Sequence, residues 1–220
     1  MRTDAGFRTI KQYVIVGAGG HARVVLSALR AMNSHKVAGC IAPSLEASSL
    51  SELEILGNDQ WLLERSPEHF ELFNGIGCVD VGDLRRNIFR QYRNAGFQFG
   101  TIIHPTAIVA NDVRIASGSQ IMAGAILQTG SQIGENVIVN TGAIIDHDCV
   151  IGDHAHIAPG AVLGGAVQVG ANSLVGAGAT IIQNTKIAEN VLVAAGSTVT
   201  GAVAAGARVA GSPAKKMIVK

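Results

Sequence analysis

The stretch from Asp146 to His156 holds three aspartates and three histidines within eleven residues of an otherwise small and aliphatic region. A neutral imidazole has a pKa of about 6.5 and can accept a proton at neutral pH, which makes histidine a common general base. A carboxylate beside it can fix the tautomer and stabilise the imidazolium that forms. His147, between Asp146 and Asp148, is therefore a candidate for acid–base chemistry.

Simpler interpretations of the same residues stay open. His147 could be a solvated residue, and His154 is expected to be an exposed side chain. Asp146 could be a turn residue, and His156 could make a structural hydrogen bond instead of contacting a ligand.

The elements that carry this stretch follow from a repeat of six residues. Every sixth residue from Ile103 to Val199 is Val, Ile or Leu, seventeen positions in succession. Two residues before each of these stands a small or β-branched residue. Six is not a helical period, and a hexapeptide repeat is typical of a β-solenoid in which three units close one triangular coil of about 18 residues. We call the seventeen positions the ladder, and we expect them to point inward.

The ladder places the candidate residues at the edges of this predicted prism. His147 and Asp148 follow the ladder residue Ile145 by two and three positions, so they lie near a corner and point outward. Cys149 takes a small inward position and is a poor nucleophile. The sides of the prism carry little charge between residues 113 and 145, which favours association of several prisms, most naturally three. The tail GSPAKKMIVK breaks the ladder and is expected to end the solenoid.

A different pattern precedes the repeat. Tyr13–Val16 reads as a strand, Gly17–Ala22 as a tight turn of the type G-x-G-x-x-G/A, and Val24–Met32 as a helix. Backbone N–H groups at such a helix start can hold a phosphate, although a merely tight turn is the alternative. The second strand, Lys36–Ile41, ends in Ala42-Pro43, where a dinucleotide enzyme would carry an acid for the ribose, so an NAD dehydrogenase is disfavoured.

A third strand at Leu72–Gly77 and a helix at Asp83–Asn94 complete a small Rossmann-like unit. The boundary falls near Gly100. We therefore predict an α/β Rossmann-like domain over residues 1–100 and an all-β parallel β-helix with a C-terminal tail over residues 101–220.

Composition excludes several classes of protein. The net charge is +1, and this near-neutral value does not indicate binding to nucleic acid or to an anionic membrane surface. No apolar run reaches the length of about 18 residues that a transmembrane helix needs, and the first ten residues lack the apolar core of a signal peptide. Three widely spaced cysteines fit a reducing compartment. We expect a soluble, cytoplasmic protein without a metal.

Four segments together show a resemblance to a known family: GAGGHARVV after the first strand, IIHPTAIV at the start of the ladder, AIIDHDCVIGDHAHIAPGAVLGG in its middle and AGSPAKKM at its end. They resemble the bacterial sugar acetyltransferases of the sialic-acid O-acetyltransferase and UDP-N-acetylbacillosamine N-acetyltransferase family, within the hexapeptide-repeat acyltransferases. The resemblance covers about Gln12 to Met217 and implies a left-handed β-helix.

The resemblance implies an acetyl-CoA-dependent homotrimer whose donor lies between neighbouring prisms. It assigns the general base to His147 and the supporting acid to Asp148. His156 and the backbone of Gly165 would contact the donor. The tail lysines could meet the CoA phosphates, with ordinary surface charges as the alternative. These lysines are Lys215 and Lys216.

In the N-terminal domain, the resemblance implies a nucleotide-sugar site. Its expected residues are Gly17, Ala18, Gly19, Gly20, His21 and Gly77. The acidic pair that the family carries after the second strand is missing here, where Ala42-Pro43 stands instead.

The predicted function is acetyl transfer from acetyl-CoA to the amino group of a nucleotide-linked amino sugar of the UDP-4-amino-sugar type, for bacterial surface glycan synthesis. The sugar amine would attack the thioester directly, so no acetyl-enzyme forms. The alternatives are O-acetylation of a sialic-acid-like sugar, a non-catalytic trimeric scaffold, and a zinc hydratase on the same prism. The last needs three converging histidines, whereas those of this chain are crowded into one stretch.

Overall fold

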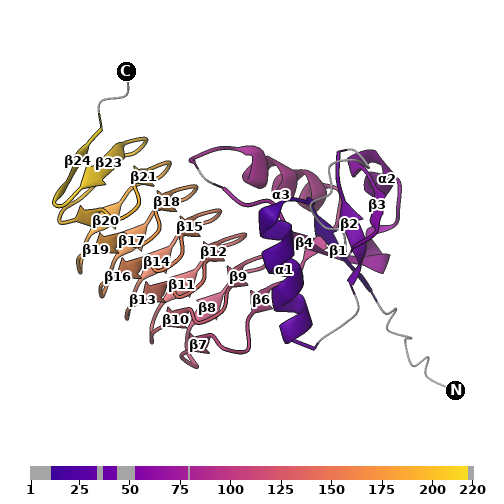
Figure 1. Ribbon diagram of the computed structural model, residues 1–220, viewed down its shortest axis with the longest axis horizontal. Helices are drawn as coiled ribbons and strands as arrows, with labels where there is room; N and C mark the ends of the chain where they lie inside the picture. Colours follow the sequence, from indigo (N-terminus) through magenta and orange to yellow (C-terminus); the bar gives the residue numbers. More distant parts are fainter. Residues whose placement is uncertain (1–10, 34–36, 44–52, 79, 218–220) are drawn as a thin grey trace, which may run out of the picture.

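The computed structural model describes residues 11–33, 37–43, 53–78 and 80–217. Figure 1 shows these residues as two parts, an α/β domain at the amino-terminal end and a long prism of short strands. The signal-peptide expectation for residues 1–10 and the first residue of the strand expected from Lys36 lie outside the described residues. The last strand of the domain ends at Phe99, and the first strand of the prism begins at Ile102.

The α/β domain is built on a five-stranded parallel sheet in the order β3-β2-β1-β4-β5. Its strands are β1 (Gln12–Val16), β2 (Val37–Ile41), β3 (Ile55–Gly57), β4 (Phe70–Asn74) and β5 (Gln98–Phe99). The sequence predicts three of the five and misses β3 and β5, because two or three residues are too few to show a period. The third predicted strand is displaced, since residues 75–77 leave the sheet as a loop that begins where the Gly75 N–H donates to the Val16 carbonyl at 2.8 Å.

Helices cover both faces of this sheet. They are α1 (Gly20–Ala31), α2 (Asp59–Leu63), the short 3-10 helix η1 (Pro67–His69) and α3 (Leu84–Asn94). α1 shares a hydrophobic cluster with Ile15, whereas α2 and α3 share another with Val14 and Val16. A parallel strand buried on both faces is apolar along its whole length, and β1 follows this rule. α1 begins at Gly20, earlier than the Val24 at which the sequence predicts its start.

The prism consists of stacked parallel strands in three sheets. The pocket sheet contains β6 (Ile102–Ile103), β9 (Gln120–Ile121), β12 (Ile138–Val139), β15 (His156–Ile157), β18 (Leu174–Val175), β21 (Leu192–Val193), β23 (Arg208–Gly211) and the antiparallel β24 (Ala214–Lys216). The apolar sheet contains β7 (Ile108–Val109), β10 (Ile126–Leu127), β13 (Ile144–Ile145), β16 (Val162–Leu163), β19 (Thr180–Ile181) and β22 (Thr198–Val199). The polar sheet contains β8 (Arg114–Ile115), β11 (Gln132–Ile133), β14 (Val150–Ile151), β17 (Gln168–Val169) and β20 (Lys186–Ile187).

The predicted ladder is the core of this prism. Residues 18 apart pair across neighbouring coils, as Leu127 does with Val109 and Ile145. Ladder side chains from Ile121 to Val199 are at most 3% exposed. Ile103 is 41% exposed, because the first coil has a neighbour on one side only.

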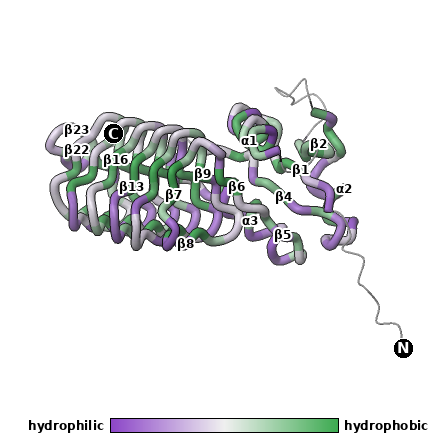
Figure 2. The backbone as a smooth tube through the Cα atoms, turned by 90° about the horizontal axis from the view of Figure 1, so that it is seen from below, coloured by the Kyte–Doolittle hydropathy of each residue, from purple (hydrophilic) through white to green (hydrophobic). Residues whose placement is uncertain are grey.

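The outward-pointing side chains determine whether the outer face of a sheet is apolar or polar. On the apolar sheet, Ile108, Ile126, Ile144 and Val162 stand in register along four neighbouring strands. Ile108 is 63% exposed and Val162 36% exposed, so the α/β domain does not cover this face. Figure 2 shows green hydrophobic segments recurring along the whole prism. Ile126 and Ile144 are half-buried, and a row of exposed and half-buried aliphatic side chains on a flat sheet marks a surface of association.

The C-terminal tail ends the prism as the sequence predicts, but it does so with a hairpin. β23 continues the pocket sheet next to β21, and β24 turns back along β23. No helix in the described ranges is both long and apolar enough to span a bilayer.

Candidate functional site

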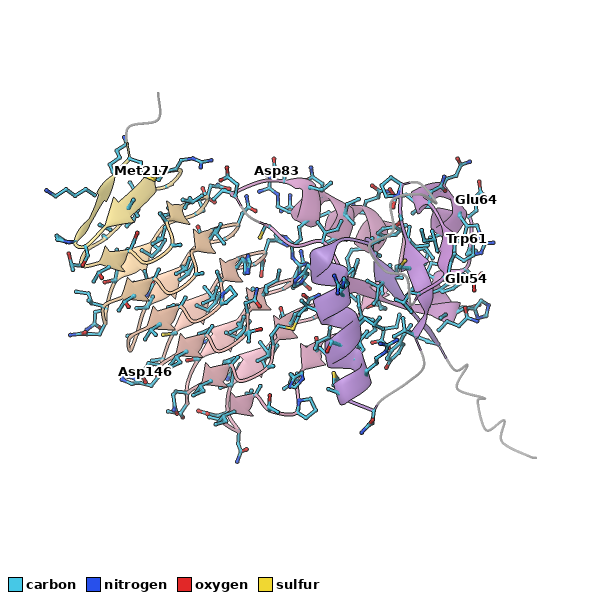
Figure 3. All side chains as sticks on the ribbon, in the orientation of Figure 1. Glu54, Trp61, Glu64, Asp83, Asp146 and Met217 are labelled. Carbon is cyan, nitrogen blue, oxygen red and sulfur yellow. The ribbon has the colours of Figure 1, made fainter. Side chains whose placement is uncertain are left out.

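His147 stands on the corner between the apolar and the polar sheet, two residues after the end of β13. Its Nδ1 lies 2.9 Å from Oδ2 of Asp148. Asp148 has a left-handed backbone, with φ of 57°, and an aspartate tolerates this conformation better than most residues. Both side chains are exposed, and the neighbouring Asp146, labelled in Figure 3, lies on a side of the prism away from the α/β domain. The corner therefore presents an acid–histidine pair to the outside.

The orientation of the imidazole follows from this contact. Because an ionised carboxylate can only accept, Nδ1 carries the proton and Nε2 holds a free lone pair. Nε2 lies over the backbone of Gly165 one coil further on, and a methyl group at Gly165 would collide with it. The N–H of Gly165 has no hydrogen-bond partner within the described chain. A base and a free backbone donor thus lie side by side.

The charge around this corner favours protonation of His147. The hydrogen bond from Asp148, followed by the negative charge of Asp146, raises the pKa of His147 above its ordinary value. The imidazole is a stronger base than a free histidine, which suits a group that must take up a proton.

A second group of predicted residues surrounds the start of α1. Gly19 is the N-cap of this helix, no acid occupies its first turn, and a side chain at Gly19 or Gly20 would meet open space. Gly17 has φ of 104°, a conformation that favours glycine, and its N–H donates to the Ile41 carbonyl at 2.8 Å. The helix start therefore opens freely onto solvent and can accept an anion.

The start of α1 forms one wall of a cavity of about 970 Å³ between the domain and the prism. Gly17 to His21 and residues 75–78 line the wall on the domain side. His156, Leu174 and Leu192 form the facing wall, in register on three neighbouring strands of the pocket sheet. The α/β domain and the prism thus each supply one wall of the cavity.

Two histidines in this cavity are neutral. Nε2 of His21 lies 2.8 Å from Oε1 of Gln120, and Nε2 of Gln120 donates to the Asn74 carbonyl at 2.7 Å, so His21 carries its proton on Nε2. Burial, with a smaller effect of the Arg85 charge, lowers the pKa of His21 to about 4. Burial, followed by the repulsion between the protonated rings of His156 and His21 and by the Arg85 charge, lowers the pKa of His156 to about 3.

His156 is held on both sides. The Asn140 Oδ1 accepts from the Thr141 N–H, which turns its Nδ2 toward Nε2 of His156 at 3.1 Å. The proton of His156 is therefore on Nδ1, which lies 3.1 Å from the Cys78 Sγ. Burial raises the pKa of the Cys78 thiol. His156 thus lines the cavity with both ring nitrogens already engaged.

Within one chain the predicted site residues form two groups. His147, Asp148 and Gly165 meet at the corner between the apolar and the polar sheet. The nucleotide-sugar residues, Gly77 included, meet at the cavity, and His156 lies there with them instead of beside Gly165. Lys215 and Lys216 are exposed on β24 at the far end of the prism. Their predicted contacts with acetyl-CoA stay predictions.

The expectation that His154 is exposed is wrong. Its ring is half-buried and meets Phe89 of α3 at a centroid distance of 5.6 Å, and its Nδ1 lies 3.0 Å from Nδ2 of Asn136. The repeat makes the three corners of a coil equivalent, so it could not show which corner the domain covers. Cys149 is fully buried and donates to the Gly164 carbonyl at 3.3 Å, as its inward position predicts.

Sequence reasoning missed the residues that join the two parts. Arg85 is 4% exposed and donates to the carbonyls of Asn74, Ile76 and Asn136 at 3.2, 2.7 and 3.3 Å. Gln120 occupies an outward position of the prism and yet is fully buried. A polar residue at an outward position gives no sign that another domain covers it, so no sequence signal was available.

Comparisons with known proteins agree with this arrangement. Residues 12–92 match the model of the PglD N-terminal domain, and residues 130–165 and 166–201 match that of the bacterial transferase hexapeptide. A comparison with curated proteins found no match to the chain.

Several solved structures are similar over nearly the whole chain. The acetyltransferase domain of PglB from Neisseria gonorrhoeae, in complex with acetyl coenzyme A, is 33% identical with a TM-score of 0.88, and the match covers 94% of this chain and 100% of that one. The chain belongs to the PglD-like family of hexapeptide-repeat sugar N-acetyltransferases. The prism is accordingly the left-handed parallel β-helix of that family, as the resemblance implied.

A second member of the family is equally similar. PerB from Caulobacter crescentus, in complex with CoA and GDP-perosamine, is 34% identical with a TM-score of 0.87, and the match covers 94% of this chain and 98% of that one. WeeI from Acinetobacter baumannii shares the fold at 19% identity and a TM-score of 0.65. Among the residues that the structure describes, no group of three His, Cys, Asp or Glu side chains could hold a metal ion.

Proposed function

We propose that this family member transfers acetyl from acetyl-CoA to the amino group of a nucleotide-linked amino sugar, in the cytoplasm and for surface glycan synthesis. The observation that carries the proposal is the similarity to PerB, an enzyme seen with CoA and GDP-perosamine, over nearly the full length of both chains. Two features of the structure support it: the open start of α1 can hold the diphosphate of the sugar nucleotide, and the acid–histidine corner can take up a proton.

His147 is the proposed general base. The amine of the sugar attacks the thioester carbonyl while its proton moves to Nε2 of His147, the nitrogen with the free lone pair. Asp148 holds the proton on Nδ1 and stabilises the imidazolium. The N–H of Gly165, which has no partner in the described chain, would stabilise the negative oxygen of the tetrahedral intermediate. The intermediate then collapses with cleavage of the C–S bond, the imidazolium of His147 gives its proton to the leaving sulfur, and CoA is released as its thiol.

A homotrimer would join the two separated groups. His147 lies on one edge of the apolar sheet, and the cavity opens on its other edge, where Pro159, Ala177 and Ala195 follow the pocket strands. When three prisms turn their apolar sheets toward a common axis, the His147 edge of each meets the cavity edge of the next. A ring of this kind is the closed form of a head-to-tail contact. Each site would then combine two chains.

The trimer can be tested on the apolar sheet. Ile126 is half-buried in the single chain and stands in the middle of the aliphatic row, where Ile126→Lys places a charge. We expect this change to dissociate the trimer, because a lysine ammonium cannot be buried there without a partner. Acetyl transfer should fall by about 100-fold, a loss typical of a misplaced catalytic group. Nucleoside diphosphates should still bind. Light scattering and calorimetry measure the two effects.

Gln132→Lys is the matched control, because Gln132 is exposed on the polar sheet and its change should leave both assembly and activity intact. A monomeric Ile126→Lys protein with full activity would contradict the composite site.

The reaction itself is tested with acetyl-CoA and either GDP-perosamine or a UDP-linked 4-amino sugar. Release of the CoA thiol and formation of the N-acetylated nucleotide sugar, followed by mass spectrometry, are expected with at least one of them. The corresponding sugar with a hydroxyl in place of the amine should stay unmodified. Transfer to a hydroxyl alone, or to none of these compounds, would overturn the proposal.

A further inference from the structure

The cavity contains a carboxylate at the place where the sequence lacks one. β2 ends in Ala42-Pro43 instead of the acid that usually contacts a ribose at this position of a Rossmann-like sheet. Asp59, at the start of α2, lines the cavity together with Ile41, Ala42 and Pro43. The Ala42 N–H donates to the Gly57 carbonyl at 3.1 Å, which fixes the start of α2 against the end of β2. An acid from another element thus reaches the same region.

One oxygen of Asp59 is fixed and the other is free. The hydroxyl of Tyr92, a fully buried residue of α3, donates to Oδ1 of Asp59 at 2.6 Å. Burial, with a smaller effect of the hydrogen bond to Asp59, raises the pKa of Tyr92, so the phenol stays protonated and remains a donor. No second partner of Asp59 occurs among the described residues. The hydrogen bond from Tyr92 therefore fixes Oδ1 of Asp59, and Oδ2 remains available to accept a hydrogen bond from a ligand.

The direction of a bound nucleotide follows from the sheet. The strand order places β2 on one side of β1 and β4 on the other, and ligands of such sheets bind where the order reverses, at the carboxyl ends of the strands. A diphosphate on the start of α1 lies between these two sides. The β4 side leads to Cys78, His156 and the prism, so the sugar belongs there. The nucleoside belongs on the β2 side, against Ile41, Pro43 and Asp59.

We propose that Asp59 accepts a hydrogen bond from the ribose 2′-hydroxyl and makes the cavity selective for ribonucleoside diphosphate sugars over their 2′-deoxy counterparts. The inference rests on the proposed function, because it concerns the nucleotide part of the same substrate. A 2′-deoxyribose leaves the free oxygen of an anchored, partly buried carboxylate without its donor. Hydrogen bonds to charged groups are strong enough for a preference of about 10–100-fold.

The test compares GDP and UDP with 2′-deoxy-GDP and 2′-deoxy-UDP by calorimetry on the full chain. The wild type should bind each ribonucleotide about 10–100-fold more tightly than its deoxy form. Asp59→Ala should bring this ratio close to one. The ratio is the readout because removing a negative charge also strengthens the binding of every diphosphate, and this general effect cancels between the two forms.

Two further variants keep the result interpretable. Asp59→Ala leaves the buried Tyr92 hydroxyl without an acceptor, so the double variant with Tyr92→Phe replaces it if the single variant does not fold. Glu64→Ala, at the end of the same helix, is the matched control and should keep the wild-type ratio. An unchanged ratio in the Asp59 variants, or a wild-type ratio near one, would overturn the inference alone. A wild type that binds no nucleoside diphosphate would overturn the proposed function as well.

Discussion

His147→Asn should lower kcat/KM for acetyl transfer by about 100- to 10,000-fold, the range that a general base contributes. Asparagine keeps roughly the size of the imidazole but has no nitrogen that can take up the proton of the attacking amine. The variant should fold as the wild type does, because the side chain is exposed at a corner and buries no contact in the ladder. Steady-state kinetics with a saturating amino-sugar nucleotide measure the loss.

The pH dependence of the wild type also tests whether His147 is the general base. A general base works in its neutral form, so kcat/KM should rise with pH and level off above the pKa of His147. Asp148 and Asp146 raise this pKa above the ordinary value for histidine, so the bend should lie above about 6.5. Asp148→Asn removes the hydrogen-bonding carboxylate and should move the bend to lower pH.

His69 provides the matched control. It is an exposed histidine with its Nε2 3.7 Å from Glu68, and it lies outside both groups of site residues. His69→Asn should leave the kinetics unchanged. A His147→Asn enzyme with wild-type kcat/KM, or an unchanged pH profile after Asp148→Asn, would show that another group takes the proton.

The repeat explains why so much of the prism could be predicted. A six-residue period fixes which residues of each coil point inward, so Ile145 and Cys149 could be placed in the core, and His147 and Asp148 outside it, without any structure. The hydrogen bond between His147 and Asp148 also depends only on local geometry at one corner. The position of Gly165 beneath the imidazole depends on the neighbouring coil. It can be predicted once residues 18 apart are known to stack.

The cavity could not be predicted in the same way, because it depends on how the domain sits on the prism. His156 was expected next to the acetyl donor, and in the structure its partners are Cys78 from the loop after β4 and Asn140 from the coil below. Asp59 reaches the end of β2 only through the pairing of β3 with β2. Contacts of this kind join residues far apart in sequence, and no period or motif reports them.

One of the contacts between domain and prism is made by a buried cation, Arg85. Arg85 joins the loop after β4 to the corner at Asn136, and no carboxylate accepts from it among the described residues. Burial lowers its pKa to about 10, so it remains charged at neutral pH, and its Nε has no partner. Three carbonyl oxygens compensate the charge instead of an acid.

Arg85→Ala should therefore destabilise the protein by about 3 kcal/mol, because the carbonyls of the buried Asn136 and the half-buried Ile76 lose their donor. For a chain of this size, the melting temperature should fall by roughly 6–12 °C. Arg85→Lys should recover only part of the loss, since one ammonium cannot reach three carbonyls in the geometry that a guanidinium fork provides. Calorimetry measures these changes.

Arg90→Ala is the matched control, because Arg90 is an exposed residue of the same helix and its loss should change stability by less than about 0.5 kcal/mol. The Arg85 variants should also bind nucleoside diphosphates more weakly than Arg90→Ala does, since Ile76 and its neighbours line the cavity. An Arg85→Ala protein as stable as Arg90→Ala would mean that water or a shifted side chain takes over the three carbonyls. The interface would then hold through its other contacts, which are the hydrogen bonds of Gln120 with His21 and Asn74 and the apolar contacts of Ile102, Met122 and Phe89.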